Sequence, residues 1–84
     1  MPPDLAVLSY VGPKSGRRVS LPVEAERIDG RWLVTVGRPE EKTWHHAFRA
    51  GQQAELLQTG VVHKVYGQLG TDSGLTVVRF DPLT

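Results

Sequence analysis

Basic and turn-forming residues gather at positions 12–18, which have the sequence Gly-Pro-Lys-Ser-Gly-Arg-Arg. Glycine, proline and serine favour tight turns, and such turns can expose backbone N–H groups. Together with the cations Lys14, Arg17 and Arg18, these groups could hold an anion such as a phosphate or a carboxylate. The alternative is a solvated hairpin turn that merely carries basic side chains, and this stretch alone leaves both interpretations open.

A second candidate stretch covers residues 38–46, Arg-Pro-Glu-Glu-Lys-Thr-Trp-His-His, which we expect to lead into a helix. A helix start has free N–H groups and a positive partial charge, and Lys42 and Thr43 lie close to it. Trp44 could stack on a planar ligand. The alternatives are a solvated Lys42, a Thr43 that only caps the helix, and a Trp44 that anchors the helix in the core. If the fold brings this stretch beside residues 12–18, both could converge on one phosphate.

Other kinds of site find little support in the sequence. The three histidines are His45, His46 and His63, and no two of them have the i, i+4 spacing of a helical metal site, so we expect no metal. The absence of cysteine excludes disulfides, thiolate metal sites and a cysteine nucleophile. Walker, Rossmann and nucleophile-elbow motifs are absent as well.

Length and charge limit the overall organisation. The 84 residues, with a net charge of +1, are expected to form one domain over residues 1–84. A chain this short buries only roughly 60–65% of its unfolded surface, so we expect a homodimer. The balanced charge argues against nucleic-acid binding. The first residues carry no basic segment and the apolar run Leu5–Val11 is too short to span a bilayer, so we expect a cytoplasmic protein.

Short strand patterns fill the first third of the chain. Leu5–Val11 is a continuous apolar run, and residues 18–25 alternate between apolar and polar. Pro22 lacks an N–H and therefore suits an edge strand. The apolar parity changes at Ile28, which indicates a bulge or a strand end. The Asp-Gly pair at 29–30 then predicts a type I′ hairpin turn.

The remaining chain predicts one helix and several strands. Residues 31–37 read as a strand, and an apolar stripe over residues 42–50 predicts a short helix. Residues 70–74 form a cluster of turn-forming residues. The last three expected strands cover residues 54–59, 61–69 and 75–80. These hairpin spacings predict a mainly β fold, a small antiparallel barrel of about six strands with one short helix.

The order of these features resembles the deazaflavin-dependent nitroreductase family, split β-barrels related to FMN-binding pyridoxamine-phosphate-oxidase-like proteins. The matching features are the basic turn at 12–17, Pro22, the turn at 29–30, and Lys-Thr-Trp at 42–44 entering a helix. That family typically has Gly-Arg-Lys-Ser/Thr-Gly-x-x-Arg between its first strands, and later Lys-Thr-Trp and Trp-x-x-Asn-Leu. The likeness covers roughly residues 5–70.

The resemblance implies binding of the deazaflavin coenzyme F420, and hydride transfer from its reduced form to a quinone, a nitroaromatic or a similar electrophile. The coenzyme supplies the hydride, so no side chain need act as a nucleophile. The residues implied in holding the coenzyme are Lys14, Ser15, Gly16, Arg17, Arg18, Lys42, Thr43 and Trp44.

Three departures from the family pattern keep other functions open. Pro13 replaces a basic residue of the turn, and Ala47 replaces the asparagine of Trp-x-x-Asn. Few residues precede the first strand, where relatives carry a segment that closes over substrate. The alternatives are a non-catalytic cofactor-binding or interaction module of the split-barrel fold, or an FMN-dependent reductase. The sequence does not name the physiological substrate.

Overall fold

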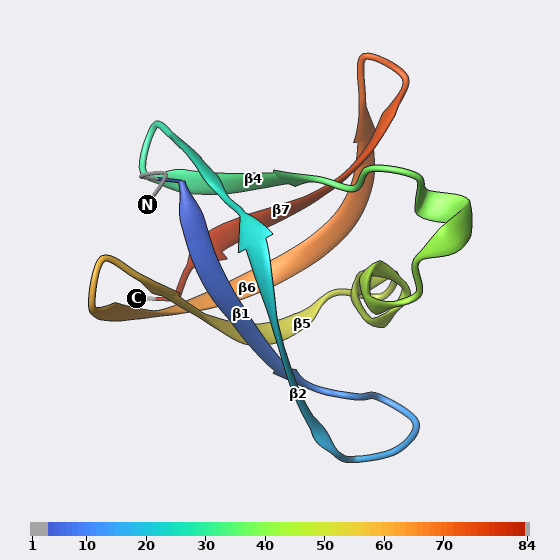
Figure 1. The fold of residues 1–84 in the computed structure, drawn as a ribbon, viewed down its shortest axis with the longest axis horizontal. Helices are drawn as coiled ribbons and strands as arrows, with labels where there is room; N and C mark the ends of the chain where they lie inside the picture. Colours follow the sequence, from blue (N-terminus) through green and yellow to red (C-terminus); the bar gives the residue numbers. More distant parts are fainter. Residues whose placement is uncertain (1–3, 84) are drawn as a thin grey trace.

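A computed structural model describes residues 4–83, so expectations about the first three residues lie outside it. Seven antiparallel strands form one curved sheet in the order β2-β1-β5-β6-β7-β4-β3 (Figure 1). The strands are β1 (Leu5–Val11), β2 (Arg18–Glu24), β3 (Glu26–Ile28), β4 (Arg31–Thr35), β5 (Gln52–Gln58), β6 (Val61–Asp72) and β7 (Leu75–Pro82). The predicted class, a small antiparallel barrel-type domain, is confirmed, with a seventh strand in β3.

The sheet curls because its two edge strands follow one another in the chain. β2 and β3 stand at opposite ends of the strand order, yet only Ala25 separates them. Ala25 is fully buried, and its N–H donates to the carbonyl oxygen of Asp4 at 2.7 Å. Pro22 lies in the edge strand β2, as its missing N–H requires. The strand pairing of residues 4–83 includes no ladder between β2 and β4, and this gap is the open side of the sheet.

Two-residue turns join β3 to β4, β5 to β6, and β6 to β7. At the first of these, Asp29 and Gly30 have φ angles of 51° and 78°. Positive φ at both positions is the type I′ signature, so this predicted hairpin is confirmed. The turns at 59–60 and 73–74 also have two positive φ angles. The turn cluster predicted at 70–74 is therefore wrong in extent, because β6 continues to Asp72 and the turn needs only two residues.

The helix predicted over residues 42–50 is also wrong, and no α-helix forms within residues 4–83. This segment instead holds the 3₁₀ helix η2 (Trp44–Phe48), and a second one, η1 (Pro39–Glu41), precedes it. A segment this short would form only a few α-helical hydrogen bonds, too few to offset the entropy lost in nucleating an α-helix. A 3₁₀ turn suits a short connector between two strands, here β4 and β5.

Phe48 fixes η2 against the interior of the sheet. Its side chain is fully buried, and its ring meets Tyr10 of β1 and Phe80 of β7 edge-on, with centroids 5.2 and 5.3 Å apart. Gly67 of β6 leaves room for this ring, because an added Cβ there would lie 2.6 Å from Phe48 Cδ1. Gln68 Nε2 donates to the Arg49 carbonyl oxygen at 3.0 Å. Three strands therefore determine where η2 sits.

The two tryptophans have different environments. Trp32 of β4 is only 2% exposed, and its Nε1 donates to Gln58 Oε1 at 3.1 Å. Gln58 in turn donates to the carbonyl oxygen of Ala25 at 3.3 Å. Trp44 is half-buried and meets Phe48 edge-on at 6.2 Å. The core anchor of the 42–50 segment is therefore Phe48, and Trp44 keeps part of its surface free for another contact.

Candidate anion-binding site

The basic turn and the η2 segment line one hollow of about 390 Å³. Lys14 and Ser15 contribute from the β1–β2 loop, and Thr43 and His46 from the η2 segment. Figure 1 shows this loop and the η1–η2 connection on the same side of the sheet. The fold thus brings the two candidate stretches together, as the convergence hypothesis requires.

The lining of this hollow favours a negatively charged ligand. It includes Lys14 and His46, and none of its described residues is acidic. Tyr10 of β1 also lines it, and burial raises the pKa of its phenol, so this group stays neutral near pH 7. A neutral hydroxyl beside a cationic ammonium can donate to an anion without repelling it.

The turn itself uses several of its backbone amides internally. The Gly12 N–H donates to the Arg17 carbonyl oxygen at 2.8 Å, and the Gly16 N–H donates to the Gly12 carbonyl oxygen at 2.9 Å. The Arg17 N–H donates to Ser15 Oγ at 3.2 Å. An anion must therefore be held mainly by side chains such as Lys14. The backbone N–H groups of the turn contribute less than the sequence predicted.

The expected positive helix start is also weak. With only five residues, η2 has a small dipole, and Thr43 makes no side-chain capping bond to its described residues. Thr43 does occupy the N-cap position of η2, where its carbonyl oxygen accepts from the His46 N–H at 3.1 Å. Thr43 also lines the first hollow, and its hydroxyl is not used in capping.

A second hollow of about 490 Å³ opens in the gap between β2 and β4. Lys42 and Trp44 line it, together with the apolar residues Leu21 and Val34. The two linings are close along the chain, because Thr43 of the first hollow lies between Lys42 and Trp44 of the second, and Val19 of the first is two residues before Leu21 of the second in β2. Each hollow has the size of a typical small-molecule site.

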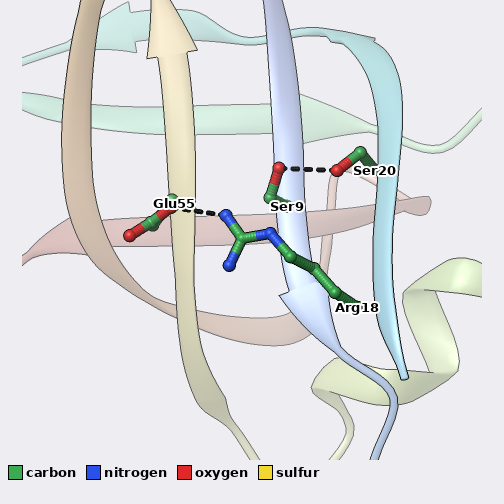
Figure 2. A network of polar contacts seen from close by, with 4 residues as sticks. All are labelled: Ser9, Arg18, Ser20 and Glu55. Carbon is green, nitrogen blue, oxygen red and sulfur yellow. Dashed lines mark hydrogen bonds and ion pairs between the residues drawn. The ribbon is translucent and has the colours of Figure 1, made fainter.

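Three predicted site residues lie outside both hollows. Gly16 and Arg17 belong to the turn but are not among the residues that line either hollow. Arg18 lies on the outer face, where its guanidinium reaches across β1 to Glu55 with a distance of 2.7 Å from Nη2 to Oε1 (Figure 2). The alternation along β2 explains this, because Val19 and Arg18 point to opposite faces of the sheet.

Of the two adjacent histidines that the sequence treated only as possible metal ligands, one enters the site and the other is buried beside it. His46 is exposed and lines the first hollow, whereas His45 is 3% exposed. Burial lowers the pKa of His45, and the neighbouring charges of His46, Arg49 and Lys42 lower it further. Its Nδ1 has no hydrogen-bond partner among the described residues. Within residues 4–83, no group of three His, Asp or Glu side chains is placed to hold a metal.

Another hollow, of about 410 Å³, lies near the β3–β4 turn. Its charged residues are Asp29, Arg31, Asp72 and Arg79, so their charges cancel. The hollow beside Lys14 combines basic residues with an acid-free lining, and it is therefore the better candidate for an anion.

Comparison of the chain with protein-family models and with curated proteins gives no match. The family resemblance therefore rests on the motifs themselves and stays a prediction. In the part of the chain that the structure describes, no helix is long and apolar enough to cross a membrane.

Proposed function

We propose that this chain binds the deazaflavin coenzyme F420 and serves as an oxidoreductase of the split-barrel type. The observation that carries the proposal is the meeting of Lys14, Ser15 and Thr43 in one acid-free hollow. These residues come from two stretches that are far apart in the sequence and that both belong to the motif resembling the nitroreductase family. Their side chains provide an ammonium and two hydroxyls, which suit a phosphate.

The planar part of the coenzyme fits the second hollow. Trp44 is half-buried there and can stack on a ring system, while Leu21 and Val34 provide apolar walls. Lys42 and Glu24 line the same hollow, so its formal charges balance and the planar end of the ligand meets a lining without net charge. The donor set and the apolar walls thus match an elongated ligand with one anionic end and one planar end.

The role of the protein in this proposal is to bind and orient. When bound, the reduced coenzyme supplies a hydride to a quinone, a nitroaromatic or a similar electrophile. Lys14 and Thr43 hold the anionic end, and Trp44 sets the plane of the ring beside the open gap between β2 and β4. The neutral phenol of Tyr10 adds a donor without adding negative charge.

One alternative is a cofactor-binding or interaction module without catalysis. Pro13 and Ala47 both line the first hollow, and they replace a basic residue and an asparagine of the family pattern. Their apolar side chains remove two polar partners from the site. An FMN-dependent reductase is a further alternative, because FMN also combines a phosphate with a planar ring.

The test is a fluorescence titration with oxidised F420, and in parallel with FMN, of the wild type and Lys14→Ala. A charge-assisted contact is worth roughly 1.5–3 kcal/mol, so we expect affinity for F420 to fall by about one to two orders of magnitude. Lys64→Ala is the matched control, because Lys64 is exposed in β6 and lines neither hollow of the site. Both variants should keep the melting temperature of the wild type.

Each outcome of the titration favours one of these functions. F420 binding that weakens only in Lys14→Ala supports the proposal, and turnover of menadione with reduced F420 separates an enzyme from a binding module. Binding of FMN alone favours the flavin reductase. If folded wild type binds neither molecule, the coenzyme proposal is rejected and the interaction module remains.

The proposal includes a homodimer in the cytoplasm. An 84-residue chain without disulfides has little core of its own, and a partner subunit would add buried apolar surface. The dimer is separate from the coenzyme proposal, since its test is the mass of the protein in solution.

A further inference from the structure

The hollow near the β3–β4 turn, of about 410 Å³, shares no lining residue with the two hollows of the candidate anion site. Leu33 of β4 and Arg79 of β7 pair with each other, and both line this hollow. Their neighbours Trp32 and Phe80 also pair with each other and belong to the buried core. Alternation along the strands therefore turns Leu33 and Arg79 to the outer face. The volume suits a small molecule.

The guanidinium of Arg79 is held in place, but it has no carboxylate partner among residues 4–83. Its Nη2 donates to the Thr71 carbonyl oxygen at 3.3 Å. Gly70 leaves room for this group, because an added Cβ there would lie 2.9 Å from Arg79 Nη1. The second guanidinium of the lining belongs to Arg31, whose Nε lies 3.0 Å from Asp81 Oδ1. Arg79 is therefore the cation that a ligand carboxylate can pair with.

Two carboxylates, those of Asp29 and Asp72, line the same hollow. Asp29 stands in the turn between β3 and β4, and Asp72 is the last residue of β6. Asp72 accepts only a long contact of 3.4 Å from Ser73 Oγ. In the part of the chain that the structure describes, neither carboxylate forms an ion pair with an arginine. Opposite charges thus line one hollow without neutralising each other directly.

We propose that this hollow binds a free α-amino acid with an apolar side chain. The carboxylate of the ligand pairs with Arg79, and the carboxylates of Asp29 and Asp72 take its ammonium. Both contacts are charge-assisted hydrogen bonds, which are stronger than neutral ones. The side chain of the ligand packs on Leu33 and on Ile28, which is 45% exposed and lines the same hollow.

The charge balance of the lining favours a zwitterion over a ligand with one charge. An anion at Arg79 also meets two carboxylates, and a cation at Asp72 also meets two guanidiniums. A zwitterion offers each of these groups its opposite. Phosphoethanolamine is a zwitterion as well, but it has no apolar group for Ile28 and Leu33. The inference goes beyond the proposed coenzyme function and does not depend on it.

The experiment follows the backbone amide signals of the wild type by two-dimensional NMR while L-leucine is added. Leucine should shift the signals of residues around the hollow in a saturable way. N-acetylleucine lacks the ammonium and leucinamide lacks the carboxylate, so each should bind at least about tenfold more weakly. Glycine and phosphoethanolamine lack the apolar side chain and should also bind at least about tenfold more weakly.

The same titration on Arg79→Gln and Asp72→Asn tests the two ends of the ligand. Each variant should bind leucine at least about tenfold more weakly than the wild type. Arg49→Gln is the matched control and should bind like the wild type, because Arg49 is exposed and lines none of the three hollows. Circular dichroism establishes that each variant is folded, and the ligand series on the wild type decides the proposal if one is not.

Several results would overturn the proposal. A wild type whose signals do not move, or move only away from the hollow, has no amino-acid site there. Equal affinity for leucine and N-acetylleucine, or for leucine and leucinamide, contradicts recognition of a zwitterion. Phosphoethanolamine that binds as tightly as leucine contradicts the role of the apolar side chain. None of these results affects the F420 titration, which decides the coenzyme proposal separately.

Discussion

The closed side of the sheet, formed by β5, β6, β7 and β4, is built differently from its open side between β2 and β4. On the closed side, ladders are long, and β6 pairs with β7 through eight residue pairs. Two tight turns, at 59–60 and 73–74, connect consecutive strands there. On the open side, β2 and β4 lack a ladder, and the loop at 12–17 meets the η1–η2 connection.

The closed side mainly stabilises the fold, whereas the open side carries the candidate site. Backbone hydrogen bonds between neighbouring strands hold the closed side, and the hollow there, near the β3–β4 turn, has a lining whose charges cancel. The open side is held by a few side chains, above all Phe48, and both hollows of the candidate site lie there. A site on loops beside a rigid sheet can vary its side chains without disturbing the ladders.

The largest expected effect comes from removing the anchor of the open side. Phe48→Ala should lower the free energy of unfolding by about 3–5 kcal/mol, because the ring is fully buried between Tyr10 and Phe80. Trp44→Ala should cost less, roughly 1–2 kcal/mol, since Trp44 is only half-buried. Urea denaturation followed by circular dichroism measures both. Equal losses in the two variants would contradict the assignment of Phe48 as the anchor.

A smaller effect is expected from pH. The pKa of His45 is lower in the folded protein than the value of about 6.5 expected when unfolded, so the unfolded chain takes up a proton more readily. Stability from this group is present above pH 6.5 and is lost as the pH falls through the lowered folded pKa. Urea titrations between pH 8 and pH 5 should show this loss in the wild type.

His45→Gln should reduce the pH dependence, because the titrating group is gone. His46→Gln serves as the control, since His46 is exposed and should leave most of the dependence in place. An unchanged pH profile in His45→Gln would show that another group is responsible.

The smallest effect is expected from Arg18→Ala. Arg18 and Glu55 form an ion pair between exposed side chains, which is worth roughly 0–1 kcal/mol. Its guanidinium lies on the outer face, so the affinity for F420 should stay that of the wild type, in contrast to Lys14→Ala. If the titration shows equal losses for both variants, Arg18 must leave Glu55 to contact the ligand, and the distinction between the two faces fails.

Local chemistry determined several elements of the fold from the sequence alone. Asp29 and Gly30 specify their own turn, because the backbone conformation with positive φ depends on these two residues and their neighbours. Period-two alternation fixed which residues of β2 point inward, and Pro22 placed β2 at an edge. The sequence also singled out the basic turn and the Lys-Thr-Trp stretch as candidates for one site.

Only the tertiary structure decided how these parts meet. Nothing local distinguishes Trp32, which is buried, from Trp44, which is half-exposed, because burial depends on which strands surround each ring. The 42–50 segment becomes a 3₁₀ connector since Phe48 must reach the space above Gly67. Likewise Lys14 lines the hollow because the fold brings the β1–β2 loop beside the η2 segment, whereas Arg18 lies in β2 and pairs with Glu55 on the outer face. These outcomes depend on contacts between residues far apart in the chain, which sequence spacing does not contain.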